Sequence, residues 1–183
     1  MRVVDIVFGV GWVAFWVYWL ISAGTAKRGQ SRWLRFAGVR VVLVLLVLLL
    51  LRRKALGGRQ QVTHDPVLWG VGLAIFALGL GLAVWARIYL GRNWGMPMST
   101  KDDPELVTTG PYRTIRHPIY TGIILAMIGT AVAVSLYWLV AVAVLGGYFI
   151  YSAVVEERNM AKLFPDTYPE YKKSTRMLIP FIF

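Results

Sequence analysis

The chain alternates long apolar runs with short polar ones, and the apolar runs approach the length that crosses a bilayer. Residues 3–24, 67–86, 119–134 and 137–155 are almost free of charged side chains; Asp5 is an exception near the start of the first. A membrane-spanning helix needs about 20 consecutive apolar residues. The pattern therefore predicts an all-α, polytopic integral membrane protein.

A further apolar run, at residues 41–51, is shorter. Its 11 residues between Arg40 and Arg52 would extend for only about 16 Å as a helix. Starting the helix near Trp33 gives enough length, but Arg35 and Arg40 must then snorkel to the interface or face other protein. With this span the prediction is about five transmembrane helices. We divide them into an N-terminal helical region, 1–86, and a C-terminal region, 87–183.

Small residues and short joints predict how the spans pack. Residues 67–86 carry glycines at 70, 72, 79 and 81. No strand precedes them, as a dinucleotide-binding loop would require, so close packing of helices is the better interpretation. The last two apolar runs are separated only by Ser135 and Leu136, which predicts a tight antiparallel hairpin.

Composition and charge narrow the class of protein. Hydrophobic residues make up 57% of the 183, against about 45–50% in soluble domains. With no cysteine and two histidines, neither disulfides nor a cysteine nucleophile are available, and we expect no metal centre. The net charge of +11 suits anionic lipid headgroups, so we expect no nucleic-acid partner.

The distribution of basic residues predicts the orientation. In the five-span arrangement, 14 Lys and Arg residues lie on the side that holds the C-terminus and 5 on the other, with Arg40 inside the membrane. The positive-inside rule makes the richer side cytoplasmic. We therefore expect an external N-terminus and a cytoplasmic C-terminus, most simply in a bacterial inner membrane.

Ionisable side chains that are candidates for function gather at residues 110–122, where Arg113, Arg116 and His117 precede an apolar run. Charged groups at a membrane boundary are costly and read as functional, although a basic snorkelling loop has the same composition. Because the helical hairpin returns the chain, Glu156 and Glu157 should meet Arg116 and His117. A purely structural role is the alternative: opposite charges at the base of the hairpin would neutralise one another and bring these groups together without catalysis or binding.

Two blocks carry a family resemblance. Arg116-His117-Pro118-Ile119-Tyr120-Thr121-Gly122 resembles the signature of the isoprenylcysteine carboxyl methyltransferase family, within a wider phospholipid methyltransferase group. A second block is similar to that family's C-terminal signature and comprises Glu156, Glu157, Phe164, Tyr168 and Tyr171, with the ending Ile179-Pro180-Phe181. Together they cover roughly residues 85–183.

The resemblance implies a cofactor and a site. The cofactor would be S-adenosyl-L-methionine, bound by Gly110, Pro111, Tyr112, Arg116, His117, Pro118, Tyr120 and Gly122, with Glu156 and Glu157 closing the site. Arg116 and Glu157 are the expected catalytic pair, and Arg113 and Arg176 would hold the head of a lipophilic acceptor. Eukaryotic-type enzymes tend to have Arg-Val-Pro after the Tyr-x-x-Tyr segment, whereas here Ser174-Thr175-Arg176 follows Lys172-Lys173. This departure favours a bacterial-type member with another acceptor.

Several functions remain open at this point. A carboxylate acceptor is favoured, because the leftover cations would repel an amine. The alternatives are a phospholipid-amine N-methyltransferase, a sterol-reductase-like enzyme and a non-enzymatic lipid-binding protein. The reductase would use NADPH, with Arg113, Lys172 and Lys173 near its 2′-phosphate. The family resemblance favours the methyltransferase over these alternatives.

Overall fold

A computed structural model of the protein describes residues 3–24, 64–94 and 105–180. Within these ranges the chain is helical, apart from one isolated parallel bridge between Ile115 and Arg176. The prediction of an all-α fold is thereby confirmed for the described residues. The elements are α1 (Val3–Ala23), α3 (Pro66–Leu90), the 3-10 helices η2 (Gly91–Asn93) and η3 (Gly110–Arg113), α4 (Pro118–Ala133), α5 (Trp138–Leu163) and α6 (Tyr168–Ser174).

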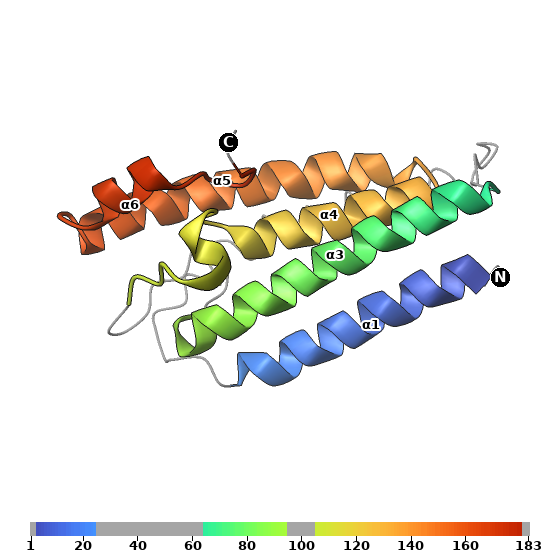
Figure 1. Ribbon diagram of the computed structural model, residues 1–183, viewed down its shortest axis with the longest axis horizontal. Helices are drawn as coiled ribbons and strands as arrows, with labels where there is room; N and C mark the ends of the chain where they lie inside the picture. The colour runs from blue at the N-terminus through green and yellow to red at the C-terminus, as the bar shows by residue number, and fades with distance from the viewer. Residues whose placement is uncertain (1–2, 25–63, 95–104, 181–183) are drawn as a thin grey trace.

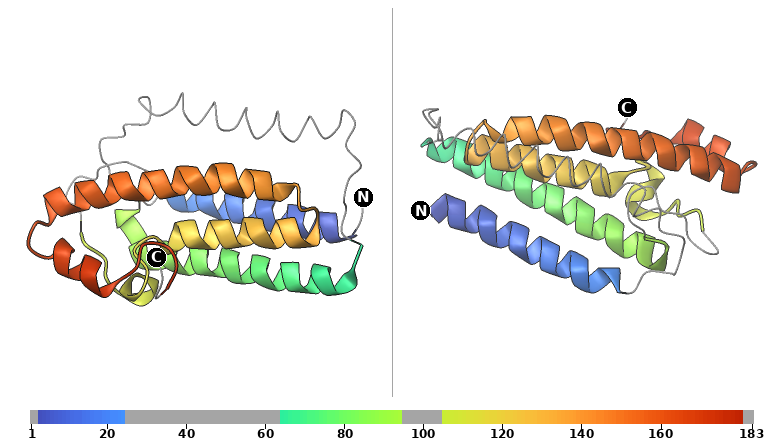
Figure 2. Two further views of the ribbon diagram at one scale, coloured as in Figure 1. Left: turned by 90° about the horizontal axis from the view of Figure 1, so that it is seen from above. Right: turned by 180° about the vertical axis from the view of Figure 1, so that it is seen from behind.

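Helices α1, α3, α4 and α5 lie lengthwise beside one another (Figure 1). α1, α3 and α5 run in one direction and α4 runs in the other, so α4 and α5 form the predicted antiparallel hairpin. The C-terminal ends of α1, α3 and α5 gather at one end of the molecule with η3, α6 and the start of α4, and Figure 2 shows this from two further directions. Both blocks of the family resemblance therefore lie at the same end of the bundle.

Three described helices are long and apolar enough to cross a membrane, namely α1, α3 extended by η2, and α5. α4 has 16 residues, about 24 Å of helix against a hydrocarbon core of about 30 Å. The predicted second span lies outside the described residues. The structure thus supports an integral membrane protein, while the count of five spans stays a prediction.

Two helices extend beyond their predicted limits. α5 continues to Leu163, whereas its apolar run ends at Val155, and α3 continues to Leu90 rather than Ala86. Polar residues such as Glu and Lys favour helices as strongly as most apolar ones. The change in polarity marks where each helix leaves the apolar layer, and the helix itself goes on. Pro169 stands in the first turn of α6, where proline is well tolerated.

The closest helix contact joins α3 and α4 through glycines spaced seven residues apart on each helix. A Cβ added at Gly72 would lie 2.6 Å from the carbonyl oxygen of Gly129, and one at Gly79 would lie 2.6 Å from that of Gly122. Gly70 and Gly81 have nothing within 4 Å of such an atom. The predicted packing through small residues is confirmed for two of the four glycines.

α1 is attached to the other helices by aromatic side chains and two polar contacts. Phe8 and Trp12 pack on Phe76 of α3, with ring centroids 4.7 and 5.5 Å apart. The indole nitrogen of Trp12 donates to the hydroxyl of Thr130 in α4 at 3.2 Å. At the other end of α1, the guanidinium of Arg87 donates to the carbonyl of Ser22.

Candidate cofactor site

The site begins with a turn that only glycine fits well. Gly110 has a φ of 58°, in the left-handed region, and a Cβ there would lie 2.5 Å from the ring of Tyr89. Both the backbone and the neighbouring ring therefore exclude a side chain. The turn leads into η3, in which Pro111 and Tyr112 are buried and Arg113 is exposed.

The C-terminal segment then fixes the backbone before α4. The amide of Arg116 donates to the carbonyl of Arg176 at 2.8 Å, and that of His117 donates to Met177 at 3.1 Å. The hydroxyl of Thr121 in turn donates to the carbonyl of Leu178 at 2.7 Å. Residues 175–178, which we call the C-terminal strap, thus run beside residues 114–117 and hold the two motif residues in place.

Glu157 is the centre of an ion-pair cluster. Its Oε1 accepts from the Nε of Arg116 at 2.7 Å, and its Oε2 lies 2.7 Å from the Nζ of Lys172. The Nε2 of His117 lies 3.7 Å from Oε1. The side chains of Arg116 and Glu157 are only 7% and 5% exposed, so the pair is largely removed from water.

Arg116 also ties the cluster to the strap. Its Nη1 donates to the carbonyl of Thr175 at 2.7 Å and to that of Lys172 at 3.2 Å. These carbonyls follow the end of α6 or lie in its last turn. One guanidinium therefore connects the start of α4, the end of α5 and the strap.

Glu156 lies on the other side of His117. The Nδ1 of His117 is 3.5 Å from the Oε2 of Glu156, and the hydroxyl of Tyr120 donates to Oε1 at 2.6 Å. The rings of His117 and Tyr120 are stacked with centroids 5.5 Å apart, and Tyr120 stacks in turn on Phe149 at 4.8 Å. An imidazole between two carboxylates is thus backed by aromatic rings.

This setting favours the imidazolium form of His117. Burial alone would lower the pKa of His117, but the adjacent carboxylates of Glu156 and Glu157 outweigh this effect, and the pKa is raised above its usual value. Its buried Nε2 has no hydrogen-bond partner within bonding distance among the described residues. The nitrogen lies 3.7 Å from Oε1 of Glu157, so it makes an ionic contact there without a hydrogen bond.

Tyr112 and Tyr171, which lie next to the cluster, are neutral phenols. The hydroxyl of Tyr171 donates to the carbonyl of Tyr112 at 2.6 Å, which joins α6 to η3. Burial raises the pKa of Tyr171 to about 12 and raises that of Tyr112 further. Neither phenol therefore ionises near neutral pH.

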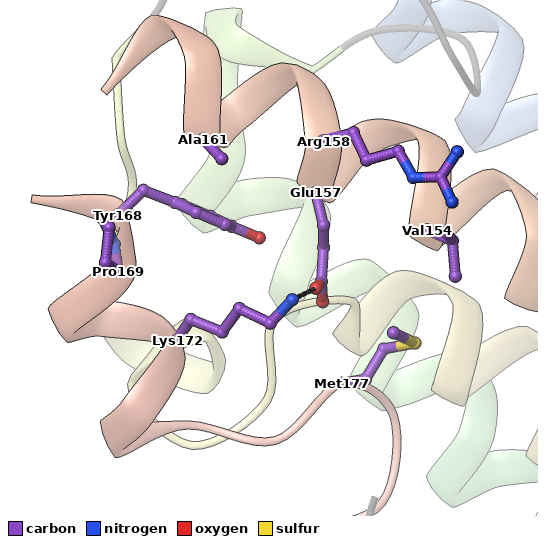
Figure 3. A pocket seen from close by; sticks show the side chains of 8 residues that line it. All are labelled: Val154, Glu157, Arg158, Ala161, Tyr168, Pro169, Lys172 and Met177. Carbon is purple, nitrogen blue, oxygen red and sulfur yellow. Dashed lines mark ion pairs between the residues drawn. The ribbon is translucent and has the colours of Figure 1, made fainter. Parts of the chain in front are cut away.

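A cavity of about 300 Å³ opens beside the cluster, between α5, α6 and the strap (Figure 3). Val154, Ala161, Pro169 and Met177 form apolar parts of its wall. The ion pair between Glu157 and Lys172 lies within it, and the hydroxyl end of Tyr168 points toward Glu157 (Figure 3). Glu157 is thus accessible from the cavity although it is buried from bulk solvent.

The structure brings most of the expected site residues together. Arg116, His117, Tyr120, Glu156 and Glu157 form the connected cluster, and Pro118 is fully buried in the first turn of α4. Gly110, Pro111 and Tyr112 adjoin it through Tyr171. Whether they bind a cofactor stays a prediction.

Three expected residues lie outside the cluster. Gly122 lies in the interface with α3, where a Cβ would be 2.5 Å from the carbonyl oxygen of Gly79. Helix packing therefore explains this glycine without any ligand. Arg113 and Arg176 are exposed, so their guanidinium groups are accessible to an acceptor, and their predicted role is untested.

Sequence reasoning missed two basic residues. Lys172, considered earlier only beside an NADPH phosphate, pairs with Glu157. Arg87 has no role in the sequence-based prediction, yet it is 3% exposed and its guanidinium carbon lies 4.9 Å from the ring centroid of Trp94. A lone cation at the end of an apolar run was the signal that could have identified Arg87. In the described ranges, no group of three or more His, Cys, Asp or Glu side chains is arranged to hold a metal ion.

Comparison with known proteins decides the family. The sequence pattern of the family described as phospholipid methyltransferase matches residues 68–167, more than half of the chain. The chain belongs to this family. The matched residues include both Arg116–His117 and Glu156–Glu157, so the resemblance found from these motifs is confirmed.

Several relatives are similar to this member of the phospholipid methyltransferase family, and their names differ. A cobalt-zinc-cadmium resistance protein of Cupriavidus metallidurans is 32% identical over 63% of this chain and 50% of its own length. Methanethiol S-methyltransferase 1 of Bradyrhizobium diazoefficiens is 38% identical over 43% and 27%. Protein-S-isoprenylcysteine O-methyltransferase of Schizosaccharomyces pombe is 29% identical over 60% and 48%. The chain thus spans half or less of the length of each of these relatives.

Proposed function

We propose that this protein is an integral membrane methyltransferase that uses S-adenosyl-L-methionine and acts on a lipophilic acceptor. The observation that carries the proposal is the cluster in which His117 lies between Glu156 and Glu157, within the region matched by the family. Two relatives named as methyltransferases, of a prenylcysteine carboxyl group and of methanethiol, support the reaction class.

The chemistry of the cluster fits the methionyl end of this cofactor. That end carries an ammonium and a carboxylate, and the cofactor as a whole carries a sulfonium. Glu156 and Glu157 suit the ammonium, while the buried Nε2 of His117, which lacks a hydrogen-bond partner, suits the carboxylate. Arg116 already bonds Glu157 and the strap, so it positions Glu157 for binding.

S-Adenosylmethionine supplies an activated methyl group when it is bound. Transfer of this group is an in-line displacement, so the protein has to orient two reactants and exclude water. The rings of Tyr112 and Tyr120 are buried beside the cluster and suit a cationic or aromatic ligand. A carboxylate acceptor is already a nucleophile and requires no general base.

Binding of S-adenosylhomocysteine to the detergent-purified protein tests this proposal. We expect calorimetric titration to detect this product and not NADPH. Glu157→Gln or His117→Ala should weaken binding about tenfold or more, because an ionic hydrogen bond contributes about 1.5–3 kcal/mol. Glu170→Gln makes the same change of charge at an exposed position of α6 and should have no effect.

The contrary results separate the alternatives. Binding of NADPH in place of S-adenosylhomocysteine would favour the reductase, and binding of neither would favour a non-enzymatic lipid-binding protein. Unchanged affinity for S-adenosylhomocysteine in both the Glu157 and His117 variants would show that the cluster is only a charge-compensated base of the helical hairpin.

We propose a carboxylate as the acceptor group. The support is the exposed pair Arg113 and Arg176, which would attract an anionic head and repel an amine. Methylation with a radiolabelled donor tests this, because mild base releases a methyl ester as methanol. Label that stays on the lipid after base treatment would instead indicate N-methylation of a phospholipid amine.

We further propose that the site faces the cytoplasm. Its support is the excess of basic residues on that side of the predicted five-span arrangement. Reporter fusions at Gly57 and at Phe183, both beyond the described residues, should report opposite sides of the membrane. If both report the same side, the predicted second span is wrong.

A further inference from the structure

Besides the imidazole of His117, Arg116 and Lys172 contact the carboxylate of Glu157, and these two cations differ in how firmly they are held. Arg116 is 7% exposed and also bonds two carbonyls, whereas Lys172 is 53% exposed. Among the described residues, Glu157 is the recorded ion-pair partner of the Lys172 ammonium. An exposed lysine in an ion pair contributes little and exchanges readily with water. Arg116 therefore belongs to the framework of the site, and Lys172 is replaceable.

Glu157 and Lys172 both line the cavity, and their ion pair is at its wall (Figure 3). Oε2 of Glu157 lies 2.7 Å from the lysine ammonium at the edge of this space of about 300 Å³. Small-molecule pockets begin at about this volume, so it has room for the amino-acid end of a ligand. Because Arg116 remains on Oε1, the carboxylate stays paired and ionised when Lys172 leaves.

A lysine ammonium and the α-ammonium of an amino acid present the same chemistry, a single positive charge with three N–H donors. We propose that Lys172 is an internal stand-in for the ammonium of the cofactor. On this view the Oε2 of Glu157 is the ammonium subsite, and Lys172 must leave it before the methionyl end can bind. This inference rests on the proposed function and identifies the oxygen involved.

The exchange is favourable for a ligand that has other contacts. The lysine gives up one exposed ion pair, and its side chain regains rotational freedom in water. The incoming ammonium belongs to a molecule whose remaining parts bind elsewhere, so its ordering is shared among several contacts. Competition from Lys172 should therefore reduce, but not prevent, binding of any ligand that carries the ammonium.

Removal of the competitor should strengthen binding. In Lys172→Met we expect the affinity for S-adenosylhomocysteine to rise about two- to fivefold, corresponding to the modest strength of an exposed ion pair. 5′-Methylthioadenosine, which lacks the amino-acid end, should bind with unchanged affinity. Lys173→Met removes the same charge from a neighbouring exposed position and should change neither affinity.

A measurement on the unaltered protein tests the displacement directly. Acetylation of Lys172 by acetic anhydride, followed by mass spectrometry, should accelerate when S-adenosylhomocysteine is added. 5′-Methylthioadenosine should leave that rate unchanged, and Lys173 serves as the internal reference for both. The ion pair protects the ammonium of Lys172 until a ligand replaces it.

The outcomes distinguish this inference from the proposed function. If S-adenosylhomocysteine binds, but Lys172→Met leaves its affinity unchanged or lower, the stand-in role is wrong and the methyltransferase proposal is unaffected. Unaltered acetylation of Lys172 in the presence of bound S-adenosylhomocysteine would overturn the inference in the same way. If no S-adenosylhomocysteine binds to any form of the protein, the proposed function fails and the inference fails with it.

Discussion

The interface between α3 and α4 and the cluster around Glu157 are built from opposite kinds of contact. At the interface, Gly72 and Gly79 meet Gly129 and Gly122, and the helices approach closely because side chains are absent. In the cluster, Glu157 is surrounded by three cationic or ionisable side chains. The first region gains from dispersion between backbones. The second depends on full satisfaction of buried charge.

The difference predicts opposite sensitivities to mutation. A close-packed interface built on glycines cannot accept an added atom, whereas an ion-pair cluster cannot lose a partner without leaving a charge unpaired. The small-residue interface also brings α4 into register with α3, and the first turn of α4 carries the site. Precise packing of the interface between α3 and α4 is therefore required for the geometry of the cluster around Glu157.

The largest effect should come from removing the buried cation. Arg116→Met leaves Glu157 with only Lys172 and His117 and removes the bonds to the carbonyls of Thr175 and Lys172. We expect a loss of about 3 kcal/mol in the free energy of unfolding, near the lower end for a broken buried pair because Lys172 remains. Denaturant unfolding in detergent measures this. Arg113→Met, at an exposed position, is the control, and an equal cost in both variants would contradict the role given to the cluster.

A single added methyl group should destabilise the interface. The new Cβ of Gly79→Ala would lie 2.6 Å from the carbonyl oxygen of Gly122, and such overpacking costs about 1–3 kcal/mol. Gly81→Ala places the same methyl group in open space on the same helix. There it should be neutral or stabilise by up to about 1 kcal/mol through helix propensity. Similar melting temperatures for the two variants would argue against close contact of α3 and α4.

The contribution of His117 to stability should depend on pH. Because the folded protein raises the pKa of His117, its stabilising contribution is complete below the unfolded value of about 6.5. It is lost as pH rises through the folded pKa. Comparison of His117→Gln with the parent from about pH 6 to about pH 9 should show a gap in melting temperature that narrows as pH increases. A gap that is constant or widens over that range would rule out an imidazolium between Glu156 and Glu157.

The smallest effect should come from removing the hydrogen bond between Trp12 of α1 and Thr130 of α4. Trp12→Phe removes the indole donor to Thr130 while keeping an aromatic ring against Phe76. Hydrogen bonds between membrane helices average about 0.6 kcal/mol, so we expect a loss of that order in detergent unfolding. Trp16→Phe, on the exposed face of α1, should cost nothing measurable. A loss above about 2 kcal/mol in Trp12→Phe would show that α1 is held chiefly by this bond.

The sequence by itself determined the helical elements and the meeting of the two motifs. Apolar run lengths located α1, α3 and α4 to within about one turn and the start of α5 to within one residue, because burial in an apolar layer imposes that pattern on any spanning helix. The two-residue joint at Ser135 and Leu136 required an antiparallel hairpin. That hairpin brought Glu156 and Glu157 back to Arg116 and His117, as the distances confirm.

Only the tertiary structure decided which members of each pattern are used. Gly72 and Gly79 face α4 while Gly70 and Gly81 do not, because the side of the helix that packs depends on the partner helix. The assignment of Gly122 to packing follows from the same contact. Lys172 and Arg87 look like ordinary basic residues in the sequence, yet one binds Glu157 and the other is buried against Trp94. The role of Lys172 depends on Glu157, which precedes it by 15 residues, and the role of Arg87 depends on Ser22 in α1. A local pattern of hydrophobic and polar residues reports the environment of a helix face. It carries no information on which distant group pairs with a charged side chain.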